Sequence, residues 1–200
     1  MLMNIKLNDL RKIFAERITG PIVPFLYRLG LTPDLVTWIG LVINVIAAAT
    51  IATNHLLIGG ILVLFSGLFD ILDGALARFT GKSTRFGALL DSTFDRLSEA
   101  FILFGILFLY SFDVHIIEIL LIFWVMTGSF LTSYIRARAE GLGMECKSGL
   151  FTRAERVIIL ALGLILNQVL IVLVILAIFV FVTVVQRMVY VWKQTKSNAS

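Results

Sequence analysis

Four aspartates stand inside or beside apolar segments of this chain, in the stretch FDILDGALARFTGKSTRFGALLDSTFDR. They form two pairs, Asp70 with Asp73 and Asp91 with Asp95. Spacings of three and four residues put the members of each pair on one face of a helix. Because carboxylates cannot stay together as bare anions in a low-dielectric place, the pattern indicates bound cations. Oxygen-only ligands favour Mg²⁺ or Mn²⁺ over zinc, and two such ions can drive phosphoryl displacement.

The residues between the two pairs suit a phosphorylated substrate. Gly74 and Gly87 remove side chains beside the carboxylates, which lets a ligand approach the backbone closely. Arg78 provides a guanidinium group for a pyrophosphate, and Thr84 adds a hydroxyl to the connecting loop.

These residues must be positioned by two consecutive helices. Asp70 lies nine residues before the expected end of one apolar segment at 79, and Asp95 lies nine after the start of the next at 86. In an antiparallel hairpin the two pairs meet at similar depth, about 8–14 Å from the membrane boundary at about 1.5 Å per residue.

Composition excludes an ordinary soluble domain, since 59% of the 200 residues are hydrophobic and only 15% are charged. A single cysteine excludes a disulfide framework or a cysteine zinc cluster. Val157–Trp192 is too long for one crossing of a core of about 30 Å, so a turn is expected at Asn167–Gln168. We predict an all-α integral membrane protein, one domain over 1–200, with six transmembrane helices after an amphipathic juxtamembrane helix at 1–20. The expected spans are about 33–53, 56–79, 86–110, 114–138, 152–167 and 169–192.

The distribution of charge predicts the orientation. With six spans, all seventeen Lys and Arg residues fall on or near the side that holds both termini. The positive-inside rule puts that side, and the aspartate site, in the cytoplasm. The net charge of +4 therefore indicates a membrane surface, and no nucleic acid partner is expected.

The pattern D-x₂-D-G-x₂-A-R-x₈-G-x₃-D-x₃-D resembles the signature of the CDP-alcohol phosphotransferase family. It is matched without a gap by Asp70, Asp73, Gly74, Ala77, Arg78, Gly87, Asp91 and Asp95. The Thr-Pro pair at the start of the first span is similar too, although Asp34 stands where the family usually has Asn. SYIRARAEGLG followed by FTRAERVIIL resembles the phosphatidylinositol-phosphate synthase branch and its archaeal-lipid relatives.

The resemblance implies that an alcohol attacks the β-phosphorus of a CDP-lipid, such as CDP-diacylglycerol or an ether lipid, and that CMP leaves. It implies that Asp70, Asp73 and Asp91 ligate two metal ions, and that Asp95 ligates one and accepts the alcohol proton. The residues implied to bind the CDP-lipid are Thr32, Pro33, Asp34, Gly74, Ala77, Arg78, Thr84 and Gly87. A homodimer is also implied.

Arginines at two further helix ends predict the acceptor. They are Arg136, Arg138, Arg153 and Arg156. Guanidinium groups that converge at one mouth suit a phosphate dianion, so we expect a phosphorylated polyol, inositol phosphate first. The alternative is glycerol 3-phosphate, as in a phosphatidylglycerophosphate synthase.

Two rival functions use the same carboxylates differently. A divalent-cation transporter is disfavoured by their one-sided depth and by the lack of an internal repeat. A non-catalytic membrane scaffold would leave the aspartates replaceable, whereas intramembrane carboxylates are usually functional. Outside the motif, Arg96 and Glu99 are expected to form an ion pair three residues apart.

Overall fold

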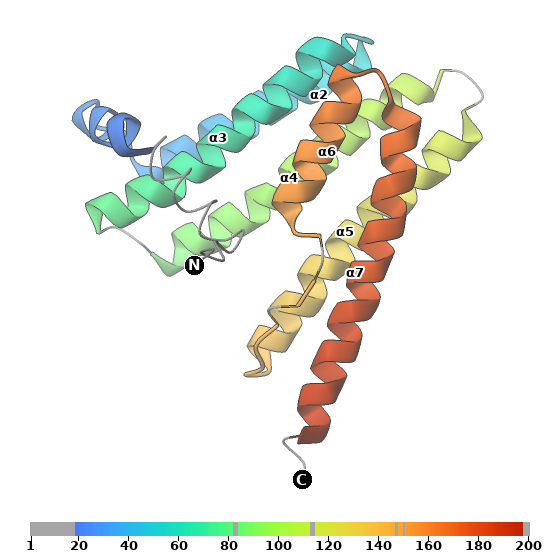
Figure 1. The fold of residues 1–200 in the computed structure, drawn as a ribbon. Coiled ribbons are helices and arrows are strands. Elements are labelled where there is room, and N and C mark those ends of the chain that lie inside the picture. Colours follow the sequence, from blue (N-terminus) through green and yellow to red (C-terminus); the bar gives the residue numbers. More distant parts are fainter. Residues whose placement is uncertain (1–18, 82–83, 113–114, 147, 150, 198–200) are drawn as a thin grey trace, which may run out of the picture. The chain divides into compact units, whose positions relative to one another are not determined.

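The computed structural model describes residues 19–81, 84–112, 115–146, 148–149 and 151–197 (Figure 1). Most of the described residues are helical. The labelled helices are α2 (Pro33–Ala52), α3 (Leu56–Thr80), α4 (Arg85–Tyr110), α5 (Ile116–Gly141), α6 (Arg153–Ile165) and α7 (Val169–Ser197). Each lies within a few residues of a predicted span, except that α7 continues past the expected end at 192.

Four of these helices, α2, α3, α5 and α7, are long and apolar enough to cross a membrane, as expected of a membrane protein. Large apolar side chains such as Phe65, Phe104 and Phe123 are exposed along the helices, which suits contact with lipid. The other two helices depart from a simple span for different reasons. α4 carries several charged residues in its first half, and α6 has only 13 residues, about 20 Å of helix.

The segment before α2 differs from the prediction. Residues 19–28 are helical, where no helix was expected between 20 and 33. The predicted amphipathic helix at 1–20 lies almost entirely outside the described residues. The predicted start of α2 is confirmed, because Leu35 N–H donates to Thr32 Oγ1 at 3.3 Å and Pro33 is the first helical residue.

The chain divides into two compact units. The first unit comprises the described residues up to Ile43 together with Phe65–Leu97, and the second comprises Asn44–Leu64 with the described residues from Ser98 onward. Helices α2, α3 and α4 each contribute residues to both units. All four predicted aspartates belong to the first unit, and all four predicted acceptor arginines belong to the second.

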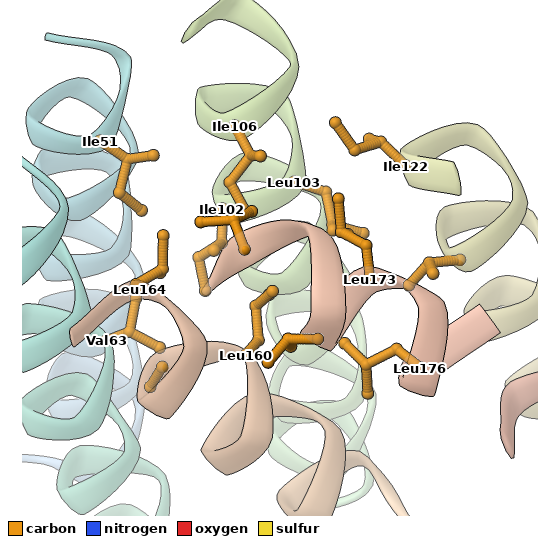
Figure 2. Close-up of a cluster of buried hydrophobic side chains, with 14 of the residues drawn as sticks. Ile51, Val63, Ile102, Leu103, Ile106, Ile122, Leu160, Leu164, Leu173 and Leu176 are labelled. Atoms are coloured by element: carbon orange, nitrogen blue, oxygen red, sulfur yellow. The ribbon is translucent and has the colours of Figure 1, made fainter. Parts of the chain in front are cut away.

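The second unit has a continuous apolar core. Figure 2 shows the largest buried side chains of this core gathered from several helices: Ile51, Val63, Ile102, Leu103, Ile106, Ile122, Leu160, Leu164, Leu173 and Leu176. Helix backbones approach closely at glycines. A Cβ at Gly60 would lie 2.8 Å from the carbonyl oxygen of Ala161, and one at Gly105 would lie 2.5 Å from that of Ala48. Small residues at such crossings are typical of helix packing in membranes.

The turn predicted at Asn167–Gln168 is confirmed. Asn167 adopts a left-handed conformation, with φ of 54°, between α6 and α7. Asn54 does the same between α2 and α3, with φ of 64°. Asparagine tolerates this region better than most residues, so each helix pair is joined by a tight reversal.

Candidate active site

A cavity of about 200 Å³ lies within the first unit, between the N-terminal part of α2, the C-terminal part of α3 and the start of α4. Its walls are formed by Pro33, Asp34, Thr37, Asp73, Gly74, Ala77, Arg78, Thr84, Gly87, Ala88 and Asp91. All the residues predicted to bind the CDP-lipid are here except Thr32, which caps α2. The structure therefore brings residues from three separate sequence segments into one cavity.

Two glycines keep the cavity open. A Cβ at Gly87 would lie 3.0 Å from Thr84 Oγ1 and 3.3 Å from Asp34 Oδ1. A Cβ at Gly74 would lie 3.4 Å from Arg78 Nη1. Thr84 also accepts a hydrogen bond of 2.8 Å from Gly87 N–H, which caps the first turn of α4.

The carboxylate of Asp73 is buried in the cavity wall, with 4% of the residue exposed. Its Oδ2 accepts a hydrogen bond of 2.7 Å from the hydroxyl of Thr37, and its Oδ1 accepts one of 2.5 Å from Gly74 N–H. Both donors are neutral groups. The negative charges of Asp91 and Asp70 also act on this carboxylate, so several like charges are gathered at one place.

The four aspartates do not all line the cavity. Asp73 and Asp91 do, Asp70 lies one helical turn before Asp73 on α3, and Asp95 lies one turn after Asp91 on α4. Within the described ranges, no three His, Cys, Asp or Glu side chains converge closely enough to hold a metal ion as they stand. The donor chemistry nevertheless fits a hard divalent cation, because the donors are carboxylate oxygens and the buried Asp73 has neutral donors and negative neighbours.

The second unit contains a buried ion pair. Glu99 Oε1 and Oε2 accept hydrogen bonds of 2.8 Å from Nε and Nη2 of Arg156, and Ser129 Oγ donates to Oε1 at 2.9 Å. The sequence predicted Arg96 as the partner of Glu99, whereas the structure pairs Glu99 with Arg156, and Arg96 Nη1 donates to the carbonyl of Ser92. Arg156 contacts both oxygens of the buried Glu99 carboxylate, and such a paired interaction is stronger than a single contact.

Further arginines surround this pair. Arg153 acts electrostatically on Glu99, and both Arg136 and Arg156 act on Arg187. Arg136 also forms an exposed ion pair with Glu140, with Nε and Oε1 2.9 Å apart. We call Arg136, Arg153, Arg156 and Arg187 the arginine group. Arg138 is exposed in the last turn of α5.

Sequence reasoning missed Arg187. This residue is 8% exposed, and its guanidinium donates to two backbone carbonyls, that of Ser148 at 3.0 Å and that of Thr132 at 2.5 Å. The signal was present, since Gln186 and Arg187 interrupt the apolar stretch of the last predicted span. A charge inside a membrane segment indicates a functional site by default.

The chain matches the sequence model of the CDP-alcohol phosphatidyltransferase family over residues 30–192. It is 36% identical over 196 residues to archaetidylinositol phosphate synthase of Methanothermobacter thermautotrophicus, covering 95% of this chain and 96% of the relative. It is 40% identical over 159 residues to phosphatidylinositol phosphate synthase of Mycobacteroides abscessus, covering 78% of this chain and 72% of the relative.

Solved structures of a related synthase also match this chain. The crystal structure of Mycobacterium tuberculosis phosphatidylinositol phosphate synthase (PgsA1) with CDP-DAG bound matches with a TM-score of 0.81 and 36% identity, covering 88% of this chain and 94% of that one. The same enzyme in complex with manganese and citrate matches with a TM-score of 0.80 at 36% identity, covering 87% and 88%. The cavity lined by the motif residues thus belongs to a chain that resembles these enzymes along most of its length, and this protein is a member of the CDP-alcohol phosphatidyltransferase family.

Proposed function

We propose that this protein transfers the phosphatidyl group, or its ether-lipid equivalent, from a CDP-lipid to a hydroxyl of inositol phosphate, with release of CMP. The observation that carries the proposal is the cavity of the first unit, whose walls are formed by the motif residues. The names of the relatives support the choice of acceptor, because both synthases compared above are inositol phosphate enzymes.

The cavity supplies the nucleotide site of this proposal. Pro33, Asp34, Ala77 and Thr84 line the space for the cytidine diphosphate, with Thr32 capping the helix that carries the first two. Gly74 and Gly87 let the ligand approach the helix backbones, and Arg78 provides paired N–H donors for the diphosphate oxygens.

The aspartates bind the metal ions and accept the proton in this proposal. In the proposal, Asp70, Asp73, Asp91 and Asp95 hold two divalent cations, Mg²⁺ or Mn²⁺, and the manganese-containing structure of the tuberculosis enzyme supports divalent metal use. When bound, the metal stabilises negative charge on the phosphoryl oxygens and on the departing CMP. Asp95 accepts the proton of the attacking hydroxyl, which then forms the new bond to the β-phosphorus.

The arginine group supplies the acceptor site. The sequence predicts that the acceptor phosphate is bound by Arg136, Arg138, Arg153 and Arg156. From the structure we add Arg187 to this set. Arg187 donates to two neutral backbone carbonyls, with the opposite charge of Glu140 also acting on it, and in the proposal its guanidinium binds the phosphate dianion. Arg156 is partly neutralised by Glu99, which holds its guanidinium in a fixed orientation.

We propose six membrane crossings, with both termini and the active site on the cytoplasmic side, and a homodimer as the working assembly. The charge count supports the orientation, since the lysines and arginines gather on one side of the six-span arrangement. The short α6 is the weakest span by length, and its turn to α7 at Asn167 supports a reversal of direction there.

A panel of acceptors tests the proposal. The purified full-length chain receives CDP-diacylglycerol or a CDP-activated isoprenoid ether lipid, with Mn²⁺ and one acceptor: inositol phosphate, glycerol 3-phosphate, free inositol or serine. We expect CMP release to be fastest with inositol phosphate. Equal use of free inositol or serine overturns the phosphate-site argument, and faster use of glycerol 3-phosphate selects the alternative synthase. Divalent-cation flux in liposomes without CMP release would favour the transporter.

A further inference from the structure

Thr37 joins α2 to the buried carboxylate of Asp73 on α3. Both residues are buried, at 8% and 4% exposure. Thr37 Oγ1 lies 2.7 Å from Asp73 Oδ2 and 3.1 Å from the carbonyl oxygen of Pro33 in its own helix. A hydroxyl carries one hydrogen and so has one best acceptor at a time. The contact with the Asp73 carboxylate, at 2.7 Å, is the shorter and therefore the stronger of the two.

The hydrogen bond fixes the orientation of the carboxylate. Gly74 N–H holds Oδ1 from α3, and Thr37 holds Oδ2 from α2. Each oxygen has two acceptor sites, so one site on each stays available for a cation after these bonds form. Among the described residues, loss of Thr37 would leave the Asp73 carboxylate with the bond from Gly74 N–H, the adjacent residue on the same helix.

We propose that Thr37 is a positioning residue for metal binding by Asp73, an inference that rests on the metal role proposed above for that aspartate. Partners that orient a ligand from outside the coordination shell are worth about 10- to 100-fold in metal affinity. Thr37 also lies one helical turn after Pro33 and Asp34, which line the same cavity. The first turns of α2 therefore contribute residues to the nucleotide cavity and also orient Asp73, the proposed metal ligand.

Thr50 offers a matched control on the same helix. Its Oγ1 donates to the carbonyl of Ile46 at 2.7 Å, the same four-residue bond that Thr37 can make to Pro33. Thr50 is more exposed than Thr37. If the hydroxyl of Thr37 bonds only to its own helix, replacing Thr37 will change Mn²⁺ binding no more than replacing Thr50 does.

The test is a titration of metal-free, purified full-length protein with MnCl₂, followed by electron paramagnetic resonance of free Mn²⁺. The variants are Thr37→Val, Thr37→Ser, Thr50→Val and Asp73→Asn. We expect Thr37→Val to weaken Mn²⁺ binding at least about tenfold, Thr37→Ser to bind nearly as wild type, and Thr50→Val to be unchanged. Thermal unfolding in the presence of a chelator checks each fold, and Thr37→Ala replaces the valine variant if that variant does not fold.

Each outcome decides a separate claim. Unchanged Mn²⁺ binding in Asp73→Asn removes the proposed metal role of Asp73 itself. Loss of binding in Asp73→Asn with wild-type binding in Thr37→Val overturns only the positioning role of Thr37. Equal weakening in Thr37→Val and Thr37→Ser also overturns it, because serine retains the donor.

Discussion

Asp73 and Glu99 are both buried carboxylates, and the two units surround them in opposite ways. Glu99, in the second unit, is held by two nitrogens of Arg156 and by the hydroxyl of Ser129. Asp73, in the first unit, accepts its hydrogen bonds from a hydroxyl and an amide, and the charges of Asp91 and Asp70 act on it with the same sign.

The difference separates a structural carboxylate from a reactive one. Burying an anion is costly unless a positive charge compensates it. The chain itself provides that charge to Glu99, so this ion pair ties α4 to α6 with no ligand required. At Asp73 the donors are neutral, so the metal ion proposed above would supply the compensating charge. The same reasoning applies to cations, because Arg156 has a carboxylate partner whereas Arg187 is solvated by backbone carbonyls.

The largest expected effect is on turnover, at a carboxylate of the first unit. Asp95→Asn removes the proposed proton acceptor, and we expect CMP release to fall about 10²- to 10⁴-fold. Binding of Mn²⁺ and CDP-lipid should persist, since Asp70, Asp73 and Asp91 remain. Rates at saturating substrates, with Glu118→Gln as the control carboxylate on α5, measure this. Activity above about a tenth of wild type places the base elsewhere.

The second prediction concerns Glu99, the buried carboxylate that pairs with Arg156. Glu99→Gln leaves a buried guanidinium without its counter-charge, and we expect a loss of about 3–5 kcal/mol in the free energy of unfolding. Glu140→Gln, which breaks the exposed pair with Arg136, should cost less than about 1 kcal/mol. Reversible unfolding in detergent measures both.

A double variant separates stability from function at the same pair. Glu99→Leu combined with Arg156→Met replaces the ions with apolar groups, which often restores stability in buried sites. We expect recovered unfolding stability with weakened inositol phosphate binding. If the double variant is stable and binds the acceptor as wild type does, Arg156 is structural only.

The third prediction concerns Arg187, whose guanidinium donates to two backbone carbonyls. Arg187→Ala should raise the KM for inositol phosphate about 10- to 100-fold, since a charged hydrogen bond contributes about 1.5–3 kcal/mol. The KM for the CDP-lipid should change little. Lys193→Ala, exposed on the same helix, is the control. Equal changes in both KM values for Arg187→Ala would indicate a general structural defect rather than an acceptor site.

Local patterns in the sequence predicted most of the fold and most of the cavity. Helix boundaries follow from apolar stretches and from local signals such as the Thr32–Pro33 start, and the structure agrees with them closely. The motif spacing places Asp73, Gly74 and Arg78 on neighbouring turns of one helix, so their common cavity follows from helical periodicity.

Contacts between segments far apart in the sequence could not be predicted from local sequence patterns. Glu99 and Arg156 are 57 residues apart, and no local pattern shows which arginine reaches a buried carboxylate. The helix at residues 19–28 was not predicted, and its sequence contains Gly20, Pro21 and Pro24, residue types that are unfavourable in helix interiors. Thr37 was missed for a related reason, since its acceptor lies 36 residues away on α3.

The smallest expected effect tests how closely the cavity of the first unit fits the CDP-lipid. Gly87→Ala adds a Cβ 3.0 Å from Thr84 Oγ1 and 3.3 Å from Asp34 Oδ1, so both side chains must shift slightly within the cavity wall. We expect a cost of about 1 kcal/mol, the low end for overpacking, which is about fivefold in the KM for the CDP-lipid. Gly67→Ala is the matched control, because its Cβ would meet nothing within 4 Å on α3. The KM for inositol phosphate should be unchanged in both variants, because none of the atoms that the added Cβ approaches belongs to the arginine group. An increase in the acceptor KM alone, with that of the CDP-lipid unchanged, would contradict the assignment of this cavity to the nucleotide.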